Sequence, residues 1–207
     1  MKTPDTAFTT GRLFHRGDYE ETAALIYATD PYIYCDLFGC EENAKRVLSY
    51  AFENEKSVFY KDAIHLVKNA RDEVIACALN APHELRWDKD ALLSDFERAE
   101  IEPTPAFFSA AEYMDKTYNY RKLGKSICNV SVKAEYRGRG VASFLLASLF
   151  EGADRGVFEL TVLKDNAAAI RLYEKFGFRI IGNDFEDYGG HGLPTVRCYR
   201  MVHNGNP

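Results

Sequence analysis

Apolar residues recur along this chain with two periods, every second residue and every third to fourth residue, and these periods predict its strands and helices. The central stretch shows both periods. Residues 127–133 carry β-branched side chains at alternate positions, Val130 and Val132, which predicts a strand. Residues 141–150 are apolar at helical spacing, so a helix is expected directly after a short turn that contains glycine.

The same patterns predict further elements on both sides of this unit. Strands are expected at residues 6–14, 63–69, 73–80, 156–163, 178–182 and 196–202. Helices are expected at residues 18–28 and 41–53, and from Asp165 or Asn166 to Gly177. The strands at 63–69 and 73–80 should form an antiparallel hairpin. The strands at 127–133 and 156–163 are joined by a helix, so they should lie parallel in a βαβ unit.

Three segments interrupt these patterns. Residues 29–39 are rich in aromatic residues between a proline and a glycine, and they are expected to form a loop. Residues 81–124 are interpreted as a helical insertion of about two helices with a break at the prolines of 103–105. Residues 183–194 are acidic and glycine-rich and should form a second loop. The chain is therefore predicted to be a single α/β domain over residues 1–207, a mixed central sheet of about six or seven strands flanked by helices.

Size, composition and charge narrow the class of protein. The chain has 207 residues, 46% hydrophobic and 28% charged, so it can bury a normal core. The net charge of -5 argues against a general nucleic-acid partner. Five cysteines without a CxxC pair favour reduced thiols over disulfides or a metal site. No apolar run reaches the ~18 residues of a membrane span and no signal peptide is evident, so a cytoplasmic protein without a membrane partner is expected.

The turn from Glu135 to Gly140, between the central strand and helix, suits an anion. Backbone N–H groups at the start of a helix point toward a bound phosphate, and the helix dipole favours its negative charge. Gly138 and Gly140 let the backbone approach such a ligand closely. Arg137 and Arg139 add positive charge.

Two common phosphate motifs do not describe this turn. It lacks the Gly-Lys-Ser/Thr end of a P-loop, and Ser143 stands where a dinucleotide fingerprint has its third glycine. The turn does match Arg-x-x-Gly-x-Ala at Arg137, Gly140 and Ala142. This pattern resembles the acyl-CoA pyrophosphate loop of the GNAT family, the GCN5-related N-acetyltransferases. On this stretch alone, an ordinary strand-to-helix turn with solvated arginines is the alternative.

A second motif makes the resemblance specific. At the spacing Asn-x-x-Ala-x-x-x-Tyr-x-x-x-Gly-Phe, typical of that family, the chain has Asn166, Ala169, Tyr173, Gly177 and Phe178. It follows the first motif by the length of one helix and one strand, and together the motifs cover residues 126–182. The resemblance implies an acyl-CoA N-acyltransferase-like fold and acetyl transfer from acetyl-CoA as cosubstrate to an amine, without a metal.

The resemblance also implies which residues hold acetyl-CoA. The pyrophosphate is expected against the backbone of Arg137, Gly138, Arg139, Gly140, Val141 and Ala142. Backbone groups of the central strand at Val130 and Val132 are expected beside the thioester, because the developing oxyanion needs preorganised donors. Asn166 and Tyr173 are two helical turns apart on one face, which suits the pantetheine amides and the sulfur.

The leaving thiolate needs a proton, and the attacking ammonium must lose one. A phenol with a pKa of ≈ 10 can supply the first, so Tyr173 is the general-acid candidate. The alternatives are a core tyrosine at 173 and a plain helix N-cap at Asn166. The sequence favours no single base. Four candidates are present, each more simply explained as structural or solvated: Glu159, His65, Asp30 and Asp36.

The expected acceptor is the amine of a small molecule or a peptide. Aromatic residues suggest a walled pocket: Tyr32, Tyr34, Phe107, Phe108, Tyr118 and Tyr120. Acidic residues near the end of the chain would suit a cationic amine: Asp184, Glu186 and Asp187. A monomer or homodimer is expected. The alternatives from other classes are a non-catalytic CoA-binding sensor or interaction module and, less favoured by the failed motifs, a protein that binds nucleotide phosphates.

Overall fold

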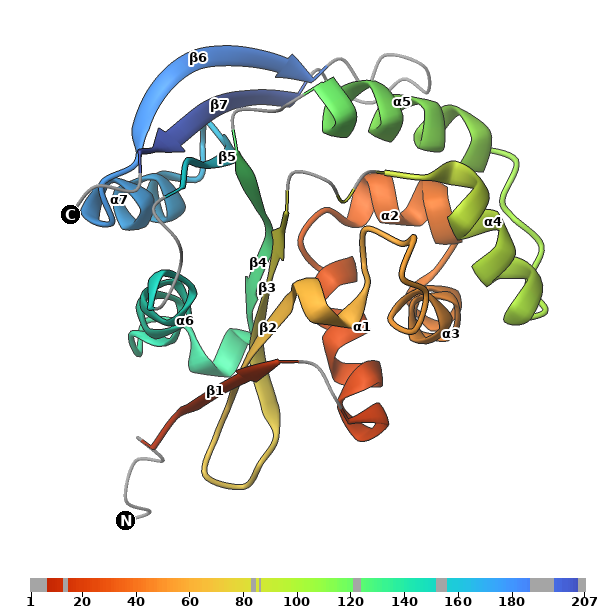
Figure 1. Cartoon of the computed structure of the whole chain (residues 1–207), viewed down its shortest axis with the longest axis horizontal. Helices are drawn as coiled ribbons and strands as arrows, with labels where there is room; N and C mark the ends of the chain where they lie inside the picture. The colour runs from red at the N-terminus through yellow and green to blue at the C-terminus, as the bar shows by residue number, and fades with distance from the viewer. Residues whose placement is uncertain are drawn as a thin grey trace.

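Seven strands form one sheet in the order β1-β2-β3-β4-β5-β7-β6 (Figure 1). This computed structural model describes residues 7–12, 15–82, 85, 87–120, 124–151, 156–186 and 196–204. The strands are β1 (Thr9–Arg12), β2 (Ile64–Lys68), β3 (Val74–Ala81), β4 (Lys125–Val132), β5 (Phe158–Leu163), β6 (Arg179–Glu186) and β7 (Val196–His203). Neighbouring strands are antiparallel except β4 and β5, which are parallel. The mixed sheet, the β2–β3 hairpin and the parallel unit are therefore confirmed.

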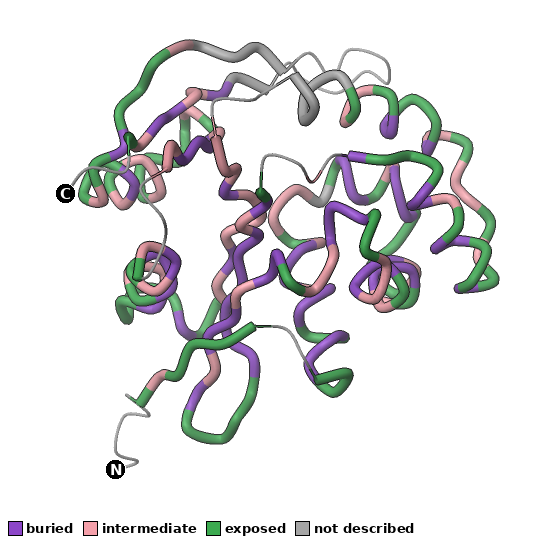
Figure 2. The backbone as a smooth tube through the Cα atoms, in the orientation of Figure 1, coloured by how far each residue is buried: buried purple, intermediate pink, exposed green. Residues whose placement is uncertain are grey.

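Helices cover both faces of the sheet and bury two apolar clusters. The helices are α1 (Tyr19–Tyr27), α2 (Pro31–Phe38), α3 (Glu41–Ala51), α4 (Lys89–Arg98), α5 (Phe107–Tyr120), α6 (Val141–Phe150) and α7 (Ala167–Lys175). The first five pack on one face, and α6 and α7 lie on the other (Figure 1). Buried residues concentrate where these helices meet β2, β3 and β4 (Figure 2). No helix in the described ranges is long and apolar enough to cross a membrane.

Residues 29–39 form a helix where the sequence predicted a loop. Helix α2 follows Asp30, whose carboxylate accepts a hydrogen bond from the backbone N–H of Ile33 at 3.1 Å. A proline occupies the first turn of α2, and its missing N–H costs no hydrogen bond because the N–H groups there have no acceptor within the helix. A glycine with φ 82° ends the helix. The prediction was wrong because Tyr34 and Phe38, four residues apart, bury one helical face in the first cluster.

Other boundaries follow the sequence more closely. Strand β1 is shorter than the one predicted at 6–14, of which residues 6, 13 and 14 lie outside the described ranges. Strand β6 continues to Glu186, so residues 183–186 pair with β7 where a loop was predicted. Helices α4 and α5 confirm the two helices expected within 81–124, with the break at the prolines between them.

Strand β4 positions the candidate site. Its register against β3 shifts at Asn129 and Val130, where two residues of β4 face one residue of β3. Such a bulge bends the strand and interrupts regular pairing. Within the described strands, β4 pairs with β5 at Lys125 and Ser126 alone, and the two strands then separate (Figure 1).

Candidate functional site

The turn between β4 and α6 exposes a row of backbone N–H groups. Gly138 (φ 73°) and Gly140 (φ 82°) both have left-handed backbone, and Gly140 precedes α6 without a side-chain cap from any described residue. The first N–H groups of a helix have no partner within it, so those of Val141 and Ala142 are available to a ligand. A Cβ built on either glycine would meet no described atom within 4 Å. Backbone conformation therefore requires glycine here, and the space beside the turn is open.

The protein itself holds the two arginines of this turn. Nε of Arg137 donates to the carbonyl oxygen of Val132 at 3.0 Å, and the Arg139 guanidinium lies 5.4 Å from the centre of the Tyr136 ring. Tyr136 is buried, and its hydroxyl accepts a hydrogen bond from Asn69 at 2.8 Å. Both arginines are exposed. They supply positive charge near the turn, while its backbone supplies the directed donors.

One edge of β4 is open beyond its short pairing with β5. The N–H of Lys133 donates to the carbonyl of Ile75 on β3 at 2.9 Å, so the N–H of Val132 points to the opposite edge. Val130 directly precedes Ser131, which pairs with Cys77 on β3, so the register shift at Asn129 turns the Val130 N–H to this open edge as well. Arg137 already binds the carbonyl of Val132. Two N–H groups thus line the open edge, which leads to the glycine turn.

Tyr173 lies on the inner face of α7, within the second apolar cluster. Its side chain is 7% exposed, and its ring packs against Phe178 with centroids 5.8 Å apart. Burial raises the pKa of Tyr173 to about 12, with a further contribution from Cys128. Cys128 belongs to β4, the strand that carries Val130 and Val132. The phenol is therefore protonated at neutral pH, as a proton donor must be.

Asn166 is the N-cap of α7, the role that was its simpler alternative. Its side-chain oxygen accepts a hydrogen bond from the backbone N–H of Ala169 at 3.1 Å. The residue is exposed. Capping uses the oxygen of the amide, so the NH₂ group can still donate to a ligand.

Two of the candidate bases have environments that oppose the role. Glu159 is 2% exposed, and its carboxylate accepts a hydrogen bond from Nη2 of Arg200 at 2.7 Å. Because the Glu159 carboxylate is paired with Arg200, it is not free to act as the base for the amine. His65 is partly buried on β2, where burial lowers its pKa to about 4 and the charge of Arg12 adds to the effect. Its imidazole is a weak proton acceptor in this setting.

The other two candidate bases lie on or beside α2. Asp30 caps α2, and it lies near Tyr34: burial raises the pKa of the Tyr34 phenol, and the charge of Asp30 adds to the increase. Asp36 has one carboxylate oxygen that is buried without a hydrogen-bond partner among the described residues. The hydroxyl of Thr104 donates to the backbone carbonyl of Asp36, so this residue faces the segment before α5. Asp30 directly follows Thr29, whose hydroxyl contacts Asn129 at the β4 bulge.

Three polar residues meet at the bulge, and sequence reasoning missed their contact. The amide nitrogen of Asn129 donates to Thr29 Oγ1 at 2.7 Å and to the Tyr34 hydroxyl at 2.6 Å. An amide within a β-branched strand was the available signal. Its partners lie about 100 residues earlier in the chain, where no local pattern could have identified them.

The aromatic residues predicted to wall an acceptor pocket have two different environments. Tyr34 and Phe107 are buried in the first cluster, whereas Tyr32 and Phe108 are 62% and 57% exposed. The exposed pair lies on α2 and α5, which contact each other. Outside the described part of the structure are the side chains of Tyr118, Tyr120, Asp184, Glu186 and Asp187. No group of three or more His, Cys, Asp or Glu residues that could hold a metal ion occurs in the described ranges.

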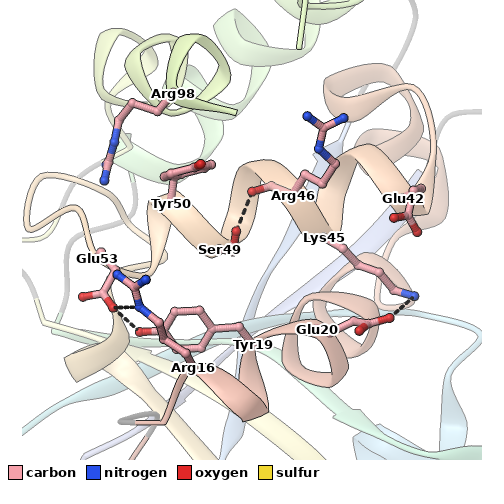
Figure 3. Close-up of a pocket in the computed structure, with 10 residues that line it drawn as sticks. All are labelled: Arg16, Tyr19, Glu20, Glu42, Lys45, Arg46, Ser49, Tyr50, Glu53 and Arg98. Carbon is pink, nitrogen blue, oxygen red and sulfur yellow. Dashed lines mark hydrogen bonds and ion pairs between the residues drawn. The ribbon is translucent and has the colours of Figure 1, made fainter. Parts of the chain in front are cut away.

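A surface pocket of about 440 Å³ lies elsewhere, between α1, α3 and the end of α4 (Figure 3). Its polar groups contact one another. The Tyr19 hydroxyl donates to Glu53 at 2.6 Å, and the Arg98 guanidinium lies 4.8 Å from the centre of the Tyr50 ring. None of the residues predicted for the functional site lines this pocket. This pocket is therefore separate from the candidate site at the turn and the open edge of β4.

Similar sequences occur in a known protein family and among curated proteins. The family model described as Acetyltransferase (GNAT) family matches residues 35–178. The L-amino acid N-acetyltransferase AaaT of Escherichia coli (strain K12) is 42% identical over 77 residues, 35% of this chain and 47% of that protein. The N-alpha-acetyltransferase RimI of Mycobacterium tuberculosis is 42% identical over 53 residues, 26% of this chain and 34% of that protein. The chain thus matches less than half the length of either relative.

Solved structures show the same fold at low sequence identity. One described as an acetyltransferase has a TM-score of 0.67 and 18% identity, with 96% of this chain and all of that chain covered. The N-acetyltransferase from Staphylococcus aureus Mu50 has a TM-score of 0.65 and 17% identity, with 94% and 100% covered. The predicted fold class is therefore confirmed.

Proposed function

The chain belongs to the GNAT acetyltransferase family, and from this premise we propose that it transfers an acetyl group from acetyl-CoA to an amine. The observation that carries the proposal is the turn at 137–142, where two left-handed glycines lead into the uncapped start of α6. An anionic group is stabilised at such a helix start by backbone N–H groups and by the helix dipole. The open edge of β4 continues this row of donors toward the opening between β4 and β5.

Binding of acetyl-CoA is assigned mainly to backbone groups. The pyrophosphate would lie on the N–H groups from Gly138 to Ala142, with Arg137 and Arg139 supplying charge. The side chain of Val141 is buried in the second cluster, so only its backbone can contribute. Along the β4 edge, the N–H groups of two valines, 130 and 132, would hold the pantetheine and the thioester carbonyl. The amide NH₂ of Asn166 would add a donor at the start of α7.

Acetyl-CoA supplies an acetyl thioester, which the amine attacks directly. A C–N bond forms, the C–S bond breaks, and the electron pair of the C–S bond leaves on sulfur. The N–H of Val130 faces the oxygen on which negative charge develops, which is the interaction that accelerates acyl transfer most. Tyr173 donates its phenol proton to the leaving sulfur, and the proton lost by the amine nitrogen passes to water, from which the phenolate is reprotonated.

The acceptor class is proposed from chemistry and from the named relatives. These relatives are named for L-amino acids and for N-alpha acetylation, so we propose the α-amine of an amino acid or peptide as the first class to test. The exposed aromatic residues Tyr32 and Phe108 would lie beside such an acceptor. The cytoplasm is the proposed location, supported by the five cysteines, none of which forms a disulfide.

Thermal unfolding with acetyl-CoA, with ATP and NAD as controls, tests the donor. A ligand at 100 times its Kd adds ≈ 2.7 kcal/mol, which for this chain length raises Tm by on the order of 5 to 10 °C. Thiol release is then measured with amino acids, peptides and polyamines. A selective Tm increase with amine-dependent thiol release supports the proposal. A Tm increase without thiol release from any amine would favour a non-catalytic CoA-binding module. A larger Tm increase with ATP or NAD would contradict the donor assignment.

A further inference from the structure

Resting on the proposed function, we infer that Asn129 is a positioning residue that sets the direction of the Val130 N–H toward the acetyl thioester. Asn129 has φ 50° in the middle of a strand. The described ranges contain two other non-glycine residues with positive φ, Asp72 (62°) and Glu100 (54°), and both lie in exposed turns. A left-handed residue within a sheet persists only when its surroundings hold it there.

The side chain of Asn129 provides that restraint. Both hydrogens of its amide nitrogen are used, one toward Thr29 Oγ1 at 2.7 Å and one toward the Tyr34 hydroxyl at 2.6 Å. Thr29 donates its own hydroxyl hydrogen to the carbonyl of Ile26 at 2.7 Å, so its oxygen is oriented to accept. Tyr34 is 3% exposed and fixed within α2. The bulge is thereby tied to the end of α1 and to α2, on the face opposite α6.

The consequence falls on the next peptide. The peptide that follows Asn129 carries the N–H of Val130, the donor assigned to the thioester oxygen. If the Asn129 backbone relaxes to ordinary strand angles, this N–H turns away from the open edge. A donor aimed at developing charge contributes more to the transition state than to the bound substrate. Loss of the Asn129 hydrogen bonds should therefore lower kcat more than it weakens acetyl-CoA binding.

Substitutions can separate this role from general stability. Asn129→Gly removes both hydrogen bonds, while glycine keeps access to φ 50° without strain. Thr29→Val removes one acceptor at nearly constant shape, and Thr29→Ser restores the hydroxyl. Asp72→Gly and Glu100→Gly are matched controls, because they place glycine at left-handed positions away from the site.

Two readouts test the inference. With the amine that gives the highest rate, kcat of Asn129→Gly should fall on the order of tenfold or more, as expected for a misdirected donor. KM for acetyl-CoA should stay within about threefold of the parent value. Thr29→Val should show an intermediate loss, and Thr29→Ser and both controls should match the parent. In addition, ¹³C NMR of acetyl-CoA labelled at the thioester carbonyl should show a downfield shift in the parent complex that Asn129→Gly reduces.

The outcomes distinguish this inference from the proposed function. A parent protein that neither binds acetyl-CoA nor releases thiol overturns the proposed function and the inference together. An active parent whose kcat and carbonyl shift are unchanged in Asn129→Gly overturns the inference alone. If Asn129→Gly does not fold, Thr29→Val decides on its own: parent-like kcat with a parent-like carbonyl shift also overturns the inference.

Discussion

Replacement of Gly140 tests whether the backbone of the turn holds the anion. The residue has φ 82° and ψ 0°, and a Cβ there would meet no described atom within 4 Å. The cost of Gly140→Ala is therefore backbone strain alone, about 1 to 2 kcal/mol. Relief of that strain turns the peptides whose N–H groups line the turn, so acetyl-CoA affinity should fall on the order of tenfold. Gly140→Asp adds a carboxylate beside the bound phosphates, which costs roughly 1 to 4 kcal/mol more.

The Tm increment caused by acetyl-CoA measures this loss. At 100 times the parent Kd the increment is on the order of 5 to 10 °C. A 100-fold weaker variant at the same concentration gains only about 0.4 kcal/mol, or roughly 1 °C. Gly177→Ala is the control, because Gly177 is also left-handed (φ 83°) but follows α7. It should lower Tm without changing the increment. A full increment in Gly140→Asp would refute the assignment of the turn.

Three further predictions concern protonation. Tyr173→Phe should lower kcat on the order of 100-fold with acetyl-CoA binding preserved, and unchanged turnover would remove Tyr173 from the mechanism. In the pH–rate profile of the parent protein, ionisation of Tyr173 should cause no loss of rate below pH ~10, because the pKa of Tyr173 is about 12. The pKa of His65 is about 4 in the folded protein and 6.5 in the unfolded chain, so the free energy of unfolding should fall as pH drops from 6.5 to 4. Urea unfolding at pH 7.5 and pH 5 measures this pH dependence, and His65→Gln should reduce it. Lys61 and then Tyr19 lower the pKa of Glu53 from 4.5 to about 2, so its contribution is present above pH 4.5 and is lost toward pH 2. Glu53→Gln should therefore destabilise the protein at pH 7 and have little effect near pH 2; equal destabilisation at both pH values would contradict this.

Residue spacing and local backbone preferences were sufficient to predict the strand and helices around the turn. Val130 and Val132 pack toward the second cluster as their alternation predicts. Asn166 caps α7, and Gly177 ends it with φ 83°. These features depend on spacing and on backbone preferences of individual residues, which are present in the sequence itself.

Prediction from local sequence failed where the conformation of a segment depends on the residues that it packs against. The segment that forms helix α2 is short and rich in aromatic residues, and its sequence therefore predicted a loop. It is a helix because Phe38 stacks on Phe96 of α4, with ring centroids 5.8 Å apart, within a cluster that also includes Phe107 of α5. Burial of that face outweighs weak helix propensity, and the burying partners lie far along the chain.

The strand–turn–helix unit, the glycines that its backbone needs and the family motifs could be predicted because each depends on residues close together in the chain. How the side chains of the site are used depends on contacts that form only in the folded protein. Arg137 turns back to β4, Glu159 is paired with Arg200, and Asn129 is held by residues about 100 positions earlier. Hydrogen-bond direction and burial depend on which distant groups meet, and a periodic pattern carries no information about them.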